Sequence, residues 1–153
     1  MTASIKNETE LGAMRIAGAL ASQVLNHVTD YVQAGIETAE LDQLCHDFIT
    51  GDLDAIPAPL NYRGFPKSVC TSINEVICHG IPDSRQLVDG DIINVDVTCN
   101  LEGYFGDASR MFIIGEIPDS TRELVEETKK CLELGIAQVR PGGRTGDIGH
   151  AIQ

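Results

Sequence analysis

Two aspartates eleven residues apart, Asp96 and Asp107, lie in the segment DIINVDVTCNLEGYFGDASRMFII at residues 91–114. Its alternation of apolar and polar residues predicts a strand at 91–99 and a returning strand at 104–114, joined by a turn at 100–103. With the turn centred there, Asp96 and Asp107 are directly opposite on one face of an antiparallel hairpin. Their Cβ atoms would then be roughly 4.5–5.5 Å apart.

Two facing carboxylates repel each other, so their arrangement requires something that offsets the repulsion. Water on a polar sheet face is the simplest solution. A shared proton is a second one, and it would raise one pKa strongly. A pair of divalent cations bridged by both carboxylates is a third, as in two-metal hydrolases. The spacing alone leaves all three open.

The segment that precedes the hairpin carries aromatic residues and a histidine. Prolines and a glycine exclude regular helix at 52–66, where Tyr62 and Phe65 either cap a core or form the wall of an apolar pocket. Short strands are predicted at 69–72 and 76–78. His79 follows directly, either as a reactive side chain displayed at a strand end or as a loop histidine satisfied by the backbone.

Helices must support this hairpin. A capping box of Asn7 and Glu10 begins an amphipathic helix that Gly35 ends, and a second helix spans about 38–51. Ser120 and Glu123 predict a third capping box, with Leu124, Cys131 and Leu132 on that helix's inner face. Thr145 caps a last segment too short to be stable alone. We therefore expect residues 1–153 to form a single domain truncated within a helix near 145–153.

Composition limits the function classes. The net charge of −12 disfavours direct binding to nucleic acid or to an anionic membrane. No apolar run is long enough to span a membrane, and the N-terminus lacks an export-signal pattern. Five widely spaced cysteines without such a signal are typical of reduced thiols, which predicts a cytoplasmic protein.

The motifs YRGFPKSVCTSINEVICHGIPD and DGDIINVDVTCNLEGYFGDASRMF together resemble the N-terminal half of a type I methionine aminopeptidase, and the resemblance extends over essentially the whole chain. It implies an α+β fold, a curved antiparallel sheet with helices on one side, which is half of the pita-bread architecture. It also implies a metalloaminopeptidase that removes the N-terminal methionine from peptides and nascent proteins by two-metal-assisted hydrolysis.

The resemblance assigns roles residue by residue. Asp96 and Asp107 resemble the aspartate ligands of two divalent ions (Co, Mn, Fe or Zn), with Asp107 bridging them. His79 resembles the histidine that contacts substrate and stabilises the transition state. Arg63 departs from the histidine often found at its position, which leaves a polar substrate contact there in doubt. The methionine pocket is implied at Tyr62, Phe65 and Cys70, and a Na or K ion at the carbonyls of Asn74 and Val76.

In that family a histidine and two glutamates from the C-terminal half complete the metal shell, and one glutamate also shuttles a proton. We therefore expect this chain alone to be poorly active or inactive, and its open half-site to permit self-association. Two other readings stay open. One is a prolidase-like Xaa-Pro peptidase of the same fold, and the other is a non-catalytic binding module.

Overall fold

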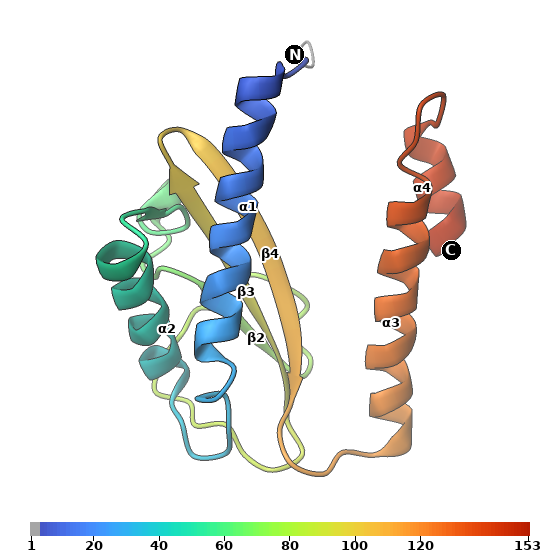
Figure 1. The fold of residues 1–153 in the computed structure, drawn as a ribbon. Coiled ribbons are helices and arrows are strands. Elements are labelled where there is room, and N and C mark those ends of the chain that lie inside the picture. Colours follow the sequence, from blue (N-terminus) through green and yellow to red (C-terminus); the bar gives the residue numbers. More distant parts are fainter. Residues whose placement is uncertain (1–3) are drawn as a thin grey trace. The chain divides into compact units, whose positions relative to one another are not determined.

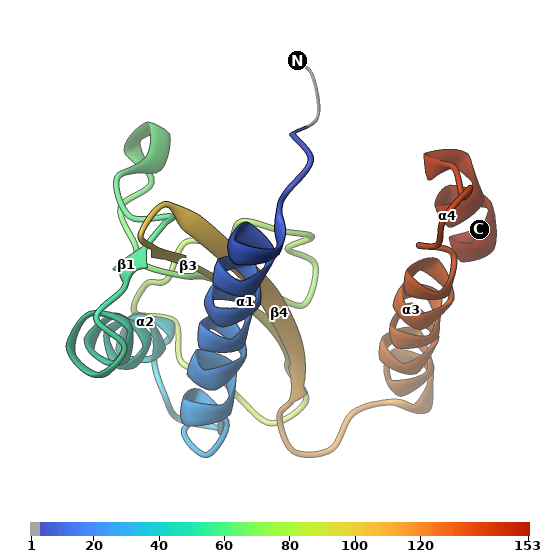
Figure 2. The same cartoon turned by 45° about the horizontal axis from the view of Figure 1, so that its top comes forward.

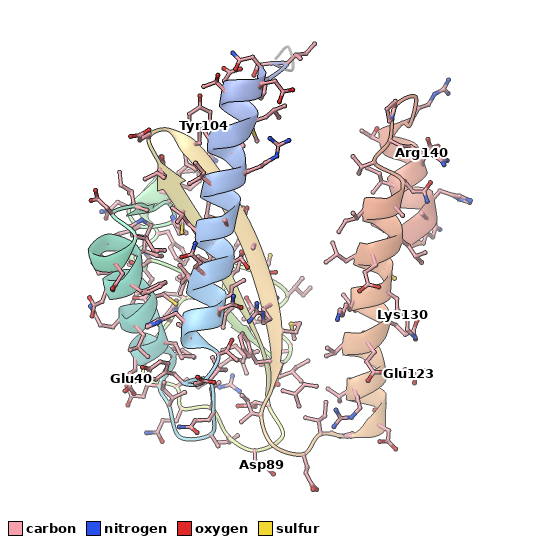
Figure 3. The ribbon with its side chains drawn as sticks, in the orientation of Figure 1. Glu40, Asp89, Tyr104, Glu123, Lys130 and Arg140 are labelled. Atoms are coloured by element: carbon pink, nitrogen blue, oxygen red, sulfur yellow. The ribbon has the colours of Figure 1, made fainter. Side chains whose placement is uncertain are left out.

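The computed structural model describes residues 4–153 and divides the chain into two compact units. The first ends at Glu116 and the second comprises Ile117–Gln153. The first unit contains a four-stranded antiparallel sheet whose central strand is β3 (Ile92–Leu101). β4 (Tyr104–Ile113) pairs along one edge of β3, while β1 (Ile56–Pro57) and β2 (Cys70–Ile73) pair along the other. Figure 3 labels Tyr104 beside the hairpin turn and Asp89 at the opposite end of β3.

The β3–β4 register differs from the predicted one. Asp96 is opposite Ser109, and Asp107 is opposite Thr98, so the two aspartates are diagonal neighbours and not a facing pair. The reason is the turn, which consists of Glu102 (φ 51°) and Gly103 (φ 87°) alone. Two successive left-handed residues are typical of a type I′ hairpin turn. Its centre lies one residue later than we assumed, which shifts the pairing by two and leaves both aspartates on one face.

Two helices cover the other face of this sheet. Figures 1 and 2 show α1 (Glu8–Val28) lying along the hairpin, with α2 (Thr38–Asp47) beside it. The alternation of β3 explains this arrangement, because its apolar residues point to the helices and its polar residues to the other side. The core is built from α1, α2 and the inner face of β3, and includes Val24, Val28, Leu41, Cys45, Val95, Val97 and Cys99. The predicted α+β architecture with helices on one side is confirmed.

The start of α1 is as predicted, but its end is not. Asn7 Oδ1 accepts a hydrogen bond from the Glu10 N–H (3.0 Å), and Glu10 Oε2 accepts one from the Asn7 N–H (2.8 Å). The helix ends at Val28 and not near Gly35. Thr29 donates its hydroxyl hydrogen bond back to Leu25 O (2.7 Å), and residues 29–35 form turns. The prediction of α2 is closer, since a π-helical turn, Phe48–Asp52, extends it to the predicted end.

Gly106 on β4 allows α1 to approach the sheet closely. It is buried, and a Cβ atom at this position would overlap the carbonyl group of Ala17. The atoms of Ala17 and Gly18 that this Cβ would overlap all belong to the backbone, so no flexible side chain can move aside to make room. The glycine that directly precedes Asp107 is therefore required for the packing that supports the hairpin.

Gly106→Ala is expected to destabilise the protein by about 1–3 kcal/mol, because overpacking forces the helix away from the sheet. Gly12→Ala in α1 is the matched control, since a Cβ there meets nothing within 4 Å. That control should be stabilising by about 0.5–1 kcal/mol, because alanine has the higher helix propensity. Urea unfolding followed by circular dichroism measures both. Equal effects of the two variants would contradict the close approach of α1.

The second unit is a helix pair, α3 (Asp119–Ala137) and α4 (Thr145–Ile152). The predicted capping box at Ser120 is wrong, because the N-cap residue is Pro118, two residues earlier, and no side chain caps the helix. Proline is favoured at helix starts because its φ is already close to helical. Likewise Arg144, not Thr145, is the N-cap residue of α4, and its N–H donates to Asp147 Oδ2 (2.8 Å).

The predicted inner face of α3 is only partly covered. Leu124 and Leu132 are each 61% exposed, whereas Cys131 is half-buried and its thiol donates to Ile152 O (3.5 Å). Gly135 is the buried residue of the helix. A Cβ at Gly135 would press on the side chain of Ile152, which places α4 against that part of α3. Figure 3 labels Glu123 and Lys130 on α3. In residues 4–153, no helix combines the length and apolar character needed to cross a membrane.

Candidate active site

A pocket of about 620 Å³ opens on the polar side of the β3–β4 hairpin. Four parts of the first unit form it: the loop after β1, the start of β2, the segment after β2, and the hairpin itself. It brings together Tyr62, Phe65, Cys70, His79, Asp96 and Asp107, the catalytic, metal and substrate residues that the sequence predicts. The two residues predicted to bind a monovalent cation, Asn74 and Val76, do not line it.

Asp96 and Asp107 lie close enough to affect each other's charge. Burial raises the pKa of Asp96 above its ordinary value, and the negative charge of Asp107 acts in the same direction. The nearby His79 opposes these effects, and a side-chain hydrogen bond to Asp107 adds to them. A raised carboxyl pKa means that the ionised pair is unfavourable here. A shared proton or a cation would relieve that repulsion, which leaves solvent alone as the weakest of the three explanations.

His79 is positioned by its backbone. It has a left-handed φ of 57°, uncommon for a residue other than glycine. Gly80 follows and packs directly on β2: its carbonyl accepts from the Thr71 N–H (2.9 Å), and its N–H donates to Ser72 Oγ (3.2 Å). A Cβ at Gly80 would overlap the carbonyl of Thr71, so only glycine fits. These contacts direct the histidine to the pocket.

The predicted strand at 76–78 is absent. Ile77 is 95% exposed, and β2 pairs only with β3 among the described residues. Asn74 has a φ of 50°, and Val76 N–H donates back to Ile73 O (3.0 Å), so the chain turns locally. The apolar residues at 76–78 favoured a strand, but no neighbouring strand is available to pair with them.

The apolar wall comes from the loop after β1. Left-handed φ angles at Asn61 (66°) and Arg63 (49°) bend the 3₁₀ turn Tyr62–Gly64, and Phe65 closes it by accepting from the Asn61 N–H (2.8 Å). Cys70 adds a buried thiol. Burial raises its pKa to about 11, helped by the charge of Asp96. The thiol is therefore protonated near neutral pH and acts as apolar surface, not as a nucleophile.

Phe105 and Ile81 also line the pocket, and our sequence reasoning missed both. Phe105 precedes Asp107 by two residues on β4, and side chains two apart on a strand share a face. The alternation therefore contained the signal for Phe105. Ile81 had no such signal, because its place depends on the close approach of Gly80 to β2.

Asn74 and Val76 lie at the far end of β2. The Asn74 side chain bridges two segments: it donates to Asp91 Oδ1 (2.7 Å) and accepts from the Ile92 N–H (3.0 Å). Val76 is 37% exposed. The side chain of Asn74 is thus engaged in holding the turn, which leaves backbone carbonyls as the donors for a cation. That role stays a prediction.

The pocket contains some, but not all, of the ligands that a hard cation needs. Carboxylate oxygens are ligands for divalent ions in hydrolases, and the pKa of Asp96 is raised first by burial and then by the negative charge of Asp107, which a bound cation would offset. Within residues 4–153, however, no group of three or more His, Cys, Asp or Glu side chains could hold a metal ion. The two aspartates therefore fit part of a metal site.

Comparisons with known proteins agree with this geometry. The chain is 50% identical to a methionine aminopeptidase of Rickettsia prowazekii over its whole length, covering 59% of that protein. It is 47% identical to the methionine aminopeptidase of Escherichia coli K12, covering 58% of it. The chain thus spans about three fifths of the length of these relatives.

Solved structures give the same fold. The crystal structure of methionine aminopeptidase from Rickettsia prowazekii superposes with a TM-score of 0.97 at 49% identity, covering 99% of this chain and 61% of that one. A prolidase from Thermococcus sibiricus matches with a TM-score of 0.72 at 18% identity over 88% of this chain and 35% of that one, which shows the shared pita-bread fold alone. The model of metallopeptidase family M24 matches residues 12–153. This chain therefore belongs to metallopeptidase family M24.

Proposed function

We propose that this chain forms the substrate pocket and part of the metal centre of an aminopeptidase that removes N-terminal methionine from peptides and nascent proteins. One observation carries the proposal: a single pocket joins the close pair Asp96 and Asp107 to an apolar wall and a histidine. The paired acids account for hydrolysis, and the apolar wall accounts for selection of an apolar first residue. The likeness to methionine aminopeptidases supports methionine as that residue.

Each residue then has a defined task. Asp96 and Asp107 would hold two divalent ions, Co, Mn, Fe or Zn, which when bound supply a hydroxide nucleophile at neutral pH and polarise the scissile carbonyl. Tyr62, Phe65 and Cys70 enclose the methionine side chain and exclude water from it. His79 donates a hydrogen bond to the group on which charge develops as the peptide bond breaks.

Further features of the proposal lie outside the pocket. The carbonyls of Asn74 and Val76 would hold a Na or K ion that stiffens the turn after β2. All five cysteines are free thiols, which suits the reducing cytoplasm where nascent chains first emerge. The partner is thus a peptide or nascent-protein N-terminus beginning with methionine, and neither nucleic acid nor a membrane takes part in binding.

Release of methionine from Met-Ala-Ser tests this function. The chain is loaded with Mn or Co and assayed alone and after mixing with the remaining part of the Rickettsia prowazekii relative. We expect little or no turnover alone, because two carboxylates are too few ligands to bind and activate a metal-bound water well. Turnover should rise when the remaining part is supplied.

An Xaa-Pro dipeptide and elemental analysis complete the test. Cleavage of the dipeptide in place of Met-Ala-Ser would favour a prolidase-like peptidase. A folded mixture that retains no metal and releases no methionine would indicate a non-catalytic binding module. Size-exclusion chromatography of the chain alone reports whether its open half-site drives self-association.

A further inference from the structure

Arg63 places a positive charge at the methionine pocket. Among the residues that line this pocket it is the only arginine or lysine, and it shares the pocket with both aspartates. In residues 4–153 the guanidinium makes no ion pair with a carboxylate; instead it lies over the Tyr62 ring, 5.5 Å from its centroid. The charge is therefore exposed, preoriented by the ring and available to a ligand.

The backbone holds this arginine in an unfavourable conformation. A φ of 49° at a residue other than glycine costs on the order of 1 kcal/mol, and the surrounding turn must maintain it. Hydrogen bonds on both sides do so: Phe65 N–H donates to Tyr62 O (3.0 Å), and Asn61 N–H donates to Phe65 O (2.8 Å). The side chain thus projects from a fixed turn beside the apolar wall and not from a loose loop.

The chemistry of a peptide substrate shows what this charge can recognise. The guanidinium repels the α-amino group, and it gains nothing from an apolar side chain. A carboxylate is the complementary group, since guanidinium–carboxylate hydrogen bonds are charge-assisted and directional. In an extended peptide the side chains of residues one and three point to the same side. Tyr62 and Arg63 are neighbours in the lining of the pocket, so a peptide whose first side chain lies against Tyr62 can bring its third side chain to Arg63.

We propose that Arg63 is a specificity-determining residue that binds an acidic side chain at the third position of the peptide. This inference rests on the proposed function, because it places the first residue of the substrate in the apolar pocket. It extends that function by naming a preferred class of substrate, namely N-termini of the type Met-small-acidic. The protein has a net charge of −12, which repels an acidic peptide. A positive charge fixed at the pocket offsets this repulsion where the peptide binds.

Peptide binding to the chain itself tests the proposal without any turnover. The probes are Met-Ala-Glu-amide, Met-Ala-Gln-amide and Met-Ala-Lys-amide, whose amidated ends remove the terminal carboxylate. Calorimetric or NMR titration should give a Kd for the Glu peptide about threefold to fivefold lower than for the Gln peptide, the range of an exposed ion pair. The Lys peptide should bind most weakly, and 0.5 M salt should reduce the differences.

Two variants locate the effect. Arg63→Gln should make the Glu and Gln peptides bind equally, and Arg63→Glu should reverse the order so that the Lys peptide binds best. Arg15→Gln is the charge-matched control, because Arg15 is exposed on α1 and does not line the pocket; it should keep the wild-type order.

The outcomes separate this inference from the proposed function. Equal binding of the three peptides by the wild-type chain, no binding of any of them, or an unchanged order in Arg63→Glu would overturn the role of Arg63. The proposed function fails on a different measurement, the absence of methionine release from Met-Ala-Ser after complementation. Gln-peptide binding by the variants shows that the pocket is still folded.

Discussion

Asp107→Asn is expected to lower divalent-metal affinity of the complemented protein by more than about 100-fold, since even groups that only support a metal ligand change affinity by 10–100-fold. The substitution keeps the size of the side chain and removes its negative charge. A neutral amide is a poorer ligand for hard divalent cations than a carboxylate is. Methionine release should fall with metal content. Elemental analysis after dialysis measures the first effect, and the Met-Ala-Ser assay measures the second.

The same variant has a readout that needs no metal. Asp107 is one of the causes that raise the pKa of Asp96. Removing its charge should therefore move that pKa down toward the ordinary aspartate value, so that Asp96 ionises at a lower pH than in the parent protein. Carboxyl ¹³C NMR titration of the metal-free chain reports this directly. Electrostatics determines the direction of this pKa change: when the negative charge of Asp107 is removed, the charged form of Asp96 becomes more favourable.

Asp30→Asn provides the matched control, because Asp30 is exposed in the turn after α1. This substitution removes the same charge from the protein as Asp107→Asn does. It should leave metal content and the Asp96 titration unchanged. The ligand assignment would be refuted by an Asp107→Asn protein that keeps its metal. An unchanged Asp96 titration would instead show that the two carboxylates do not interact.

The faces of the hairpin were predictable, whereas its register was not. Strict alternation from Ile93 to Cys99 determines which side is buried, and this is enough to place Asp96 and Asp107 on one polar face. The register depends on the turn, which we centred on Leu101-Glu102, whereas the structure centres it on Glu102-Gly103. A left-handed Glu102 is a local conformational choice that composition does not reveal.

The remaining errors come from contacts distant in sequence. In the sequence, Gly80 looks like an ordinary loop glycine. The structure shows that only glycine fits there, because a Cβ atom would overlap the carbonyl of Thr71 on β2. The apolar residues of α3 predict a buried face, but burial depends on a partner surface that periodicity does not identify. The pocket residues Tyr62, Phe65 and His79 were named from motifs, and only the fold shows that they meet around one cavity.

His79→Ala is expected to lower kcat of the complemented enzyme by about 10²–10⁴-fold, the range for loss of an acid–base or charge-stabilising group. His79 lines the pocket together with both aspartates, and its charge opposes the rise in the pKa of Asp96, so it lies near the paired carboxylates. We assign it to the substrate and not to the metal. Metal content should therefore stay near that of the parent, and KM should change less than kcat.

His79→Asn separates the imidazole from the backbone. The left-handed φ of 57° is tolerated better by asparagine than by alanine, so this variant keeps the local turn while removing the histidine ring. Both variants should lose similar activity if the ring is what acts, whereas a largely active His79→Asn would assign the effect to the backbone. His150→Ala, at an exposed position on α4, is the control for loss of a histidine. If metal disappears in parallel with activity in both His79 variants, the histidine is a ligand and the division of tasks proposed for the pocket is wrong.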